Sequence, residues 1–164
     1  MTGKEAIKTA LHSTLGMYSM YLADLSDADL LVRPVPAANH TAWQLGHLIC
    51  SEVGLLSGML PGASLPALPA GFKEQHDKPT AAMEPPKGFA TKETYLKLFG
   101  QVREATIAAV EKLSDTDLDR PTSGPMAKFA PTLGALLVLT SNHVLMHLGQ
   151  VTVVRRKLGK PILF

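Results

Sequence analysis

The sequence is poor in cysteine and in net charge. It contains one cysteine, Cys50, so a disulfide cannot form within the chain, and the start "MTGKEAIKTALH" lacks a signal-peptide pattern. We therefore expect a reducing, cytoplasmic location. The formal net charge is only +2, and Lys and Arg are scattered, so we expect no nucleic-acid partner. No apolar stretch reaches the roughly 20 residues that a membrane-spanning helix needs, so we expect no membrane partner either.

Alternating strand patterns are also missing, whereas helical periodicity recurs in four segments. These segments are residues 4–24, 40–60, 92–113 and 132–158. Asn39 or Thr41 is expected to cap the second segment, and Thr91 the third. Four amphipathic helices of about 20 residues predict an all-α four-helix bundle. The length of 164 residues predicts a single domain over residues 1–164.

A proline-rich connector occupies residues 61–90, between the second and third predicted helices. Six of its thirty residues are proline, so a helix cannot run through it. Connectors of this length are unusual in a compact domain and often serve a function, for instance as a lid. Leu65, Leu68, Phe72 and Phe89 provide apolar anchors. We therefore expect a loop that folds over one end of the bundle and forms a wall of the substrate pocket.

Two of the six histidines lie on the apolar face of the fourth predicted helix. His143 and His147 are four residues apart, so both point in the direction of the leucines and valines of that face. Hydrogen bonds to backbone carbonyls, Asn142 or Gln150 are the alternative explanation. However, two neutral rings would need separate partners, and two charged rings would repel each other. Coordination of one metal ion satisfies both rings, and we predict a metal site here.

A third ligand is expected from the second predicted helix. This helix is apolar except for a stripe of small and polar residues without Lys or Arg: His40, Gln44, His47, Ser51, Gly54 and Gly58. Glycine gains nothing at an exposed helix position, so we interpret the stripe as the wall of a cavity. His47 lies in the middle of the stripe and is the predicted third ligand. His40 lies two turns earlier, about 10 Å along the axis, which is too far to share the ion.

Other residues have simpler interpretations. His12 is expected either at the surface or with its ring hydrogen-bonded, and Trp43 is expected to serve packing rather than to contact a cofactor. His76, beside Asp77 in the connector, either reaches the site or is solvated. Cys50 fits a small core residue. Glu52 could act as a general base, but a salt bridge to a neighbouring helix is the favoured interpretation.

Two longer motifs carry a family resemblance. "NHTAWQLGHLICSE", followed about a hundred residues later by "NHVLMHLGQVTVVRRKLGKP", resembles the DinB superfamily of bacterial metalloenzymes over almost the whole chain. The H-x-x-x-H-x-G-Q segment is the most specific part. The resemblance implies a four-helix bundle, often a homodimer, in which His47, His143 and His147 bind a divalent metal ion, typically nickel or zinc. Characterised relatives include S-transferases that use low-molecular-weight thiols and a mycothiol-dependent isomerase.

These observations predict a metal-dependent enzyme. Three imidazoles leave a coordination position open, and the metal there lowers the pKa of a bound water or thiol. The resemblance favours transfer of a low-molecular-weight thiol to an electrophile. Three alternatives remain: a metal-dependent hydrolase, a non-catalytic metal-binding stress-response protein, and a metal-free bundle that acts through dimerisation. Ser51, Asn142 and Gln150 are candidates for hydrogen bonds to the ligand rings.

Overall fold

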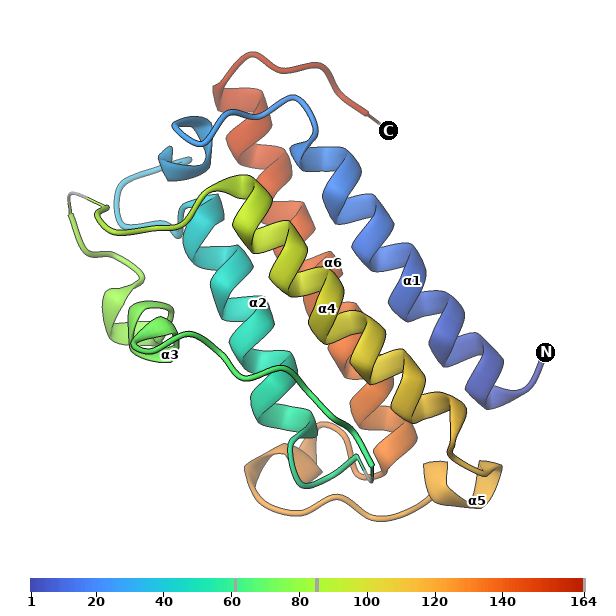
Figure 1. Cartoon of the computed structure of the whole chain (residues 1–164). Coiled ribbons are helices and arrows are strands. Elements are labelled where there is room, and N and C mark those ends of the chain that lie inside the picture. Colours follow the sequence, from blue (N-terminus) through green and yellow to red (C-terminus); the bar gives the residue numbers. More distant parts are fainter. Residues whose placement is uncertain (61, 85, 164) are drawn as a thin grey trace.

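The computed structural model describes residues 1–60, 62–84 and 86–163, which form helices and turns without a strand. Its long helices are α1 (Gly3–Leu22), α2 (Thr41–Leu56), α4 (Lys92–Glu111) and α6 (Leu133–Lys157). They pack as a bundle in which α1 and α2 each contact both α4 and α6 (Figure 1). The connections contain the short helices η1 (Asp29–Leu31), α3 (Phe72–Gln75), η2 (Lys78–Thr80), α5 (Asp115–Leu118) and η3 (Pro125–Lys128). The predicted all-α four-helix bundle is confirmed.

Side chains at the helix ends explain where the helices begin. Thr91 caps α4 as predicted, because its hydroxyl accepts a hydrogen bond from the N–H of Thr94 at 3.2 Å. The prediction for α2 was wrong, since His40 is its cap: the His40 Nδ1 accepts from the N–H of Trp43 at 3.2 Å. His40 is therefore buried at the start of α2 and is engaged there.

The bundle has two apolar clusters, separated by a layer of buried polar side chains. On each long helix this layer falls between residues of the two clusters, as Thr14 does between Leu11 and Tyr18. At its centre, Arg103 of α4 forms a 2.8 Å salt bridge with Glu52 of α2 and donates to the carbonyl of Leu11 of α1 at 3.1 Å. The layer thus connects three helices, and the salt-bridge interpretation of Glu52 is confirmed.

The connector over residues 61–90 contains helices α3 and η2, and its Pro61 and Pro85 lie outside the described residues. Its anchors act as predicted: Phe72 is buried, and Leu65, Leu68 and Phe89 pack against the core. Its predicted place over one end of the bundle was wrong, since α3 lies along the flank of α2 (Figure 1). The guanidinium of Arg33 holds the later part by donating to the carbonyls of residues 81 and 83 at 2.7 and 2.8 Å.

Helix α6 is long and apolar enough to cross a membrane by length and composition alone. The expectation that the chain lacks such a stretch was therefore wrong. Within the bundle, 44% of its most apolar window is buried. Because the central helix of a helical bundle passes the same test, this helix is weak evidence for a membrane span.

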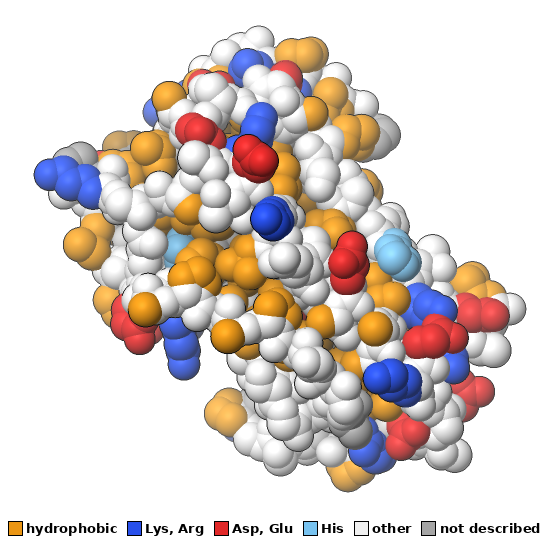
Figure 2. All heavy atoms as spheres, viewed as in Figure 1, with side chains coloured by type: hydrophobic (Ala, Val, Ile, Leu, Met, Phe, Trp, Pro, Cys, Tyr) orange, Lys and Arg blue, Asp and Glu red, His pale blue; other side chains and the backbone are white. Residues whose placement is uncertain are grey.

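One face of the molecule shows how its charges are distributed (Figure 2). Acidic and basic side chains are interspersed there, without a continuous patch of one sign. Apolar side chains gather near the centre of this face, where α2 and α4 lie. The mixture of charges on this face agrees with the small net charge of +2.

Candidate metal centre

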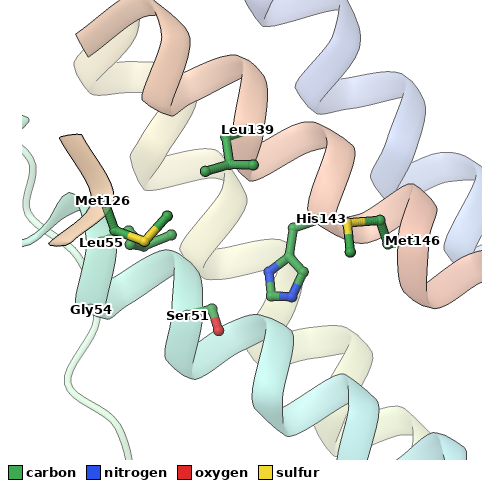
Figure 3. A pocket seen from close by; sticks show the side chains of 7 residues that line it. All are labelled: Ser51, Gly54, Leu55, Met126, Leu139, His143 and Met146. Carbon is green, nitrogen blue, oxygen red and sulfur yellow. The ribbon is translucent and has the colours of Figure 1, made fainter. Parts of the chain in front are cut away.

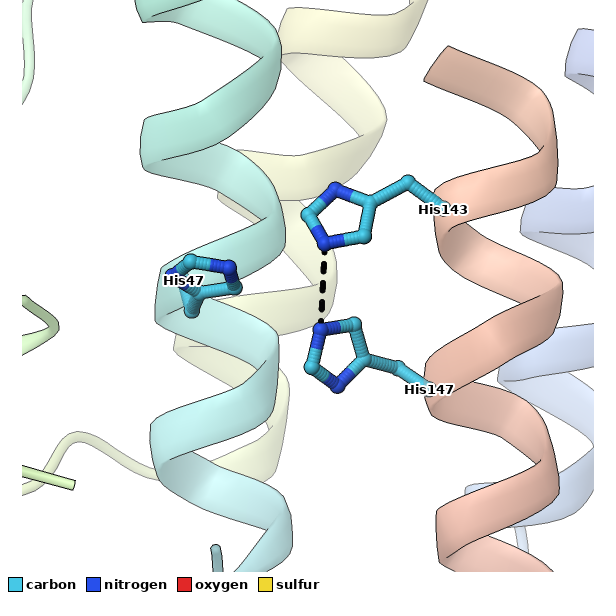
Figure 4. Close-up of side chains that lie close together, drawn as sticks. All are labelled: His47, His143 and His147. Atoms are coloured by element: carbon cyan, nitrogen blue, oxygen red, sulfur yellow. Dashed lines mark hydrogen bonds between the residues drawn. The ribbon is translucent and has the colours of Figure 1, made fainter. Parts of the chain in front are cut away.

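Three histidines meet between α2 and α6. One ring nitrogen from each of His47, His143 and His147 lies within 4.8 Å of the other two. His47 projects from α2, and the other two project from successive turns of α6 (Figure 4). The two Nε2 atoms of His143 and His147 are 3.2 Å apart. The fold thus brings together the three residues chosen from the sequence, and their binding of a metal stays a prediction.

The three rings are in the neutral state that metal binding requires. Burial lowers the pKa of His143 and of His147 to about 4, and it also lowers the pKa of His47. His47 further disfavours a positive charge on His143, and His47 and His143 both do so on His147, which adds to the shifts of the pair on α6. At neutral pH the protein therefore presents neutral imidazoles, which are ligands for divalent transition metals.

The spacing and hydrogen bonding of the pair on α6 fit a bound ion. Two nitrogens that each lie about 2.0–2.1 Å from one ion are roughly 3.0–3.4 Å apart, and the observed separation is 3.2 Å. The buried Nδ1 of His147 lacks a hydrogen-bond partner among the described residues. The side chain of Gln150 interacts with this ring and raises its pKa against the effect of burial. However, Gln150 does not form a hydrogen bond with the Nδ1 of His147. Histidine ligands usually donate this second N–H to an oxygen.

His47 is supported by the connector that flanks α2. The indole of Trp43 stacks on the His47 ring, with centroids 4.7 Å apart and planes inclined by 9°. The Trp43 Nε1 donates to the hydroxyl of Thr80 at 3.1 Å. A hydrogen bond that the ring donates to the backbone carbonyl of His76 also raises the pKa of His47, opposing the larger effect of burial. Sequence reasoning treated Trp43 as packing alone, although its four-residue spacing from His47 places the two side chains on adjacent turns.

The side chain of His76 is buried and lies outside the cluster of ring nitrogens, so the solvated interpretation was wrong, whereas its backbone reaches the site at His47. Its side chain is buried, and its Nδ1 donates to the carbonyl of Phe72 at 2.7 Å. Because a carbonyl only accepts, Nε2 is unprotonated and accepts from the hydroxyl of Tyr95 at 2.7 Å. The ring rests on Gly46, where a Cβ would lie under 3.0 Å from three ring atoms. Only glycine at position 46 lets the connector approach α2 this closely.

A pocket of about 380 Å³ opens beside the histidines, between α2 and α6 (Figure 3). It is lined by residues of α2, α6 and η3: Ser51, Gly54, Leu55, Leu139, His143, Met146 and Met126. The predicted cavity wall on α2 is confirmed at Ser51 and Gly54. The wall predicted from residues 61–90 was wrong, because Met126 of the later connector takes that place. The described part of residues 61–90 contacts Trp43 and His47, and none of its residues lines this pocket.

The remaining candidates lie outside the cluster of ring nitrogens. Ser51 is near it, with its hydroxyl oxygen 3.5 Å from the His47 Nε2. Burial raises the pKa of the half-buried Cys50 to about 11, so its thiol is protonated at neutral pH. Asn142 is exposed on α6, and His12 is exposed on α1 as expected.

Comparisons with known proteins agree with this architecture. The model of the DinB superfamily matches residues 10–151. The structure is similar to YfiT from Bacillus subtilis, a probable metal-dependent hydrolase with an unusual four-helix bundle topology. The identity is 17%, the TM-score is 0.70, and the match covers 96% of this chain and 89% of YfiT. A conserved protein from Enterococcus faecalis is also similar, with 17% identity, a TM-score of 0.68, and coverage of 98% and 99%. These similarities establish the fold, and none of the curated proteins matches this chain.

Proposed function

We propose that this chain, which belongs to the DinB superfamily, is a metal-dependent enzyme that transfers a low-molecular-weight thiol to an electrophile. The observation that supports the metal is the cluster of His47, His143 and His147, whose ring nitrogens lie within 4.8 Å of one another. Nickel or zinc is the proposed ion, because both accept imidazole and thiolate ligands. Such an ion leaves coordination positions open and lowers the pKa of a thiol or water that binds there.

The protein's own residues have three tasks in this proposal. His47, His143 and His147 hold the ion as neutral rings. Trp43 and the connector fix the orientation of His47 through the stacked indole and its hydrogen bond to Thr80. The apolar walls of the adjoining pocket limit the access of water to the reacting groups.

The nucleophile is proposed to come from outside the protein. Cys50, the one thiol of the chain, has a pKa raised to about 11 by burial and is half-buried. Its charged neighbours are Lys73, Glu74 and Asp77, which belong to the connector. A protonated thiol is a poor nucleophile, so this cysteine is unsuited to the reaction. An exogenous small thiol, for which nickel and zinc have high affinity, takes that role.

Metal content tests the ligand set directly. Protein purified without a metal-affinity tag is analysed for its elements, together with His47→Ala, His143→Ala, His147→Ala and the control His12→Ala. Each of the first three variants is expected to lose most of the metal, because two imidazoles hold an ion much more weakly than three. The exposed His12 lies on α1, so its variant should keep the metal. Full metal content in any of the three variants removes that residue from the ligand set.

Spectroscopy and turnover test the thiol. Adding a cellular thiol to the nickel- or cobalt-substituted protein should change its absorption spectrum. The loaded protein should also conjugate that thiol to a test electrophile faster than the metal-free protein or His147→Ala. If thiols leave the spectrum unchanged and conjugation matches the metal-free control, the transferase proposal is wrong.

A metal-dependent hydrolase is the second candidate, favoured by the description of the similar YfiT as a probable metal-dependent hydrolase. Hydrolysis of a panel of esters and amides by the loaded protein, without added thiol, distinguishes it from the transferase. If the protein binds metal but turns over no substrate in either assay, the alternative of a non-catalytic metal-binding stress-response protein is favoured. We also propose a cytoplasmic homodimer, which analytical ultracentrifugation and cell fractionation test.

A further inference from the structure

The pocket between α2 and α6 is apolar except near the histidine cluster. The side chains in its lining that form hydrogen bonds are Ser51 and His143. Both lie at the histidine cluster, where the Ser51 hydroxyl is 3.5 Å from the His47 Nε2. Leu55 and Met126 form the end away from His143 (Figure 3). A molecule that fills this pocket therefore meets polar groups at Ser51 and His143 and hydrocarbon or thioether groups along the rest of the lining, including Met146 beside His143.

The lining also selects against charge. Its seven residues include no Lys, Arg, Asp or Glu. A charged group placed among them would lose its hydration without gaining an ion pair, which is unfavourable. The volume of about 380 Å³ is at the small end of the range for ligand sites. Met126 and Met146 provide flexible walls, because methionine adapts to different apolar shapes.

We propose that this pocket binds the uncharged, apolar part of the substrate, an aryl group or a short alkyl chain, with the polar reacting group at the His143 end. This inference rests on the proposed function, since it assigns the pocket to the electrophile. The enzyme would then select electrophiles by the apolar body that they carry, and it would discriminate against anionic ones.

Gly54 allows the pocket to be filled without disturbing the fold. It lies in α2 with a negative φ, and a Cβ built on it has nothing within 4 Å. Gly54→Leu therefore places a side chain in the pocket and avoids a clash with the core. Gly16→Leu in α1 is the matched control, because Gly16 is an exposed helical glycine with equally open surroundings. Met126→Glu adds a charge at the far end as an independent second variant.

Two fluorescent probes with the same ring system measure binding. N-phenyl-1-naphthylamine is neutral, and 8-anilino-1-naphthalenesulfonate carries a sulfonate. The wild-type protein is expected to bind one neutral probe per chain, and the sulfonate more weakly. Gly54→Leu and Met126→Glu should each raise the Kd of the neutral probe about tenfold or more, the equivalent of about 1.4 kcal/mol. Gly16→Leu should leave it unchanged.

The outcomes distinguish the pocket from the metal. Equal binding by Gly54→Leu and Gly16→Leu, or tighter binding of the sulfonate, overturns the assignment of the pocket. If wild-type protein is a dimer that binds no neutral probe, and Gly54→Leu makes it monomeric, the pocket is occupied by a second copy and the inference is wrong. Metal content is measured on the same samples. Pocket-dependent probe binding by a protein that takes up no metal would support the apolar site and refute the metal-dependent function.

Discussion

Gly46→Ala should undock the connector from α2. The added Cβ would lie under 3.0 Å from three atoms of the His76 ring, which is closer than a Cβ approaches atoms to which it is not bonded. Neither the backbone at Gly46 nor the ring of His76 can move easily to relieve this clash. Gly46 lies within a buried stretch of α2, and His76 is hydrogen-bonded through both nitrogens to Phe72 and Tyr95. Either the ring leaves its place or the connector moves as a whole.

The contacts that Gly46→Ala disrupts determine how much the free energy of unfolding falls. Two hydrogen bonds of His76 contribute about 1 kcal/mol each to stability. Overpacking a well-filled site costs typically 1–3 kcal/mol. Alanine regains up to about 1 kcal/mol, because it has a higher helix propensity than glycine. The free energy of unfolding of Gly46→Ala should therefore fall by about 2–4 kcal/mol.

Gly54→Ala is the control, since it makes the same substitution two turns later in α2. The gain in helix propensity is shared, whereas a Cβ at Gly54 has nothing within 4 Å. This variant should be neutral or more stable by about 0.5–1 kcal/mol. The difference between the two variants isolates the contact with His76, because the propensity effects cancel.

Urea denaturation measures both variants, and limited proteolysis locates the change. Gly46→Ala should be cut faster within residues 62–84, and its Trp43 fluorescence should shift because the hydrogen bond to Thr80 is lost. If Gly46→Ala is as stable and as protease-resistant as Gly54→Ala, the ring of His76 does not rest on α2. The support of His47 by the connector would then be wrong as well.

Three further predictions concern the core and the site. Burial lowers the pKa of His143 and His147 to about 4, so the unfolded chain takes up protons first as the pH falls below about 6.5. The metal-free protein should then lose about 1.4 kcal/mol of stability per pH unit for each such ring down to about pH 4, and His147→Gln should show a shallower slope in urea titrations. Arg103→Met leaves the buried carboxylate of Glu52 unpaired, and should cost about 3–5 kcal/mol in urea denaturation; adding Glu52→Gln should recover part of this loss, and an additive double variant would contradict the coupling. Thr80→Val removes the acceptor of the indole N–H and should weaken metal binding up to about tenfold in a chelator competition, whereas Thr80→Ser should restore it; equal affinities would show that the stacked indole does not position the ligand.

The sequence determined the helices and the faces on which their residues lie. Apolar periodicity predicted all four long helices, because a repeat of 3.6 residues is a local property of the chain. It also placed His143 and His147 together on the buried face of α6, since residues four apart share a face whatever surrounds them. The stripe on α2 with His47, Ser51 and Gly54 was predicted for the same reason, as the absence of Lys and Arg distinguished it from a solvent-exposed face.

Only the tertiary structure decided which faces meet and what supports them. Helix α2 is apolar on most sides, so its sequence could not show whether α4, α6 or the connector covers each side. The stack of Trp43 on His47 and the contact of His76 with Gly46 depend on a loop whose path periodicity does not describe. The pocket wall from Met126 has the same origin, because it depends on where η3 returns to the bundle. Local patterns fix the direction of a side chain relative to its own helix, whereas the partner that it meets depends on the packing of all four helices.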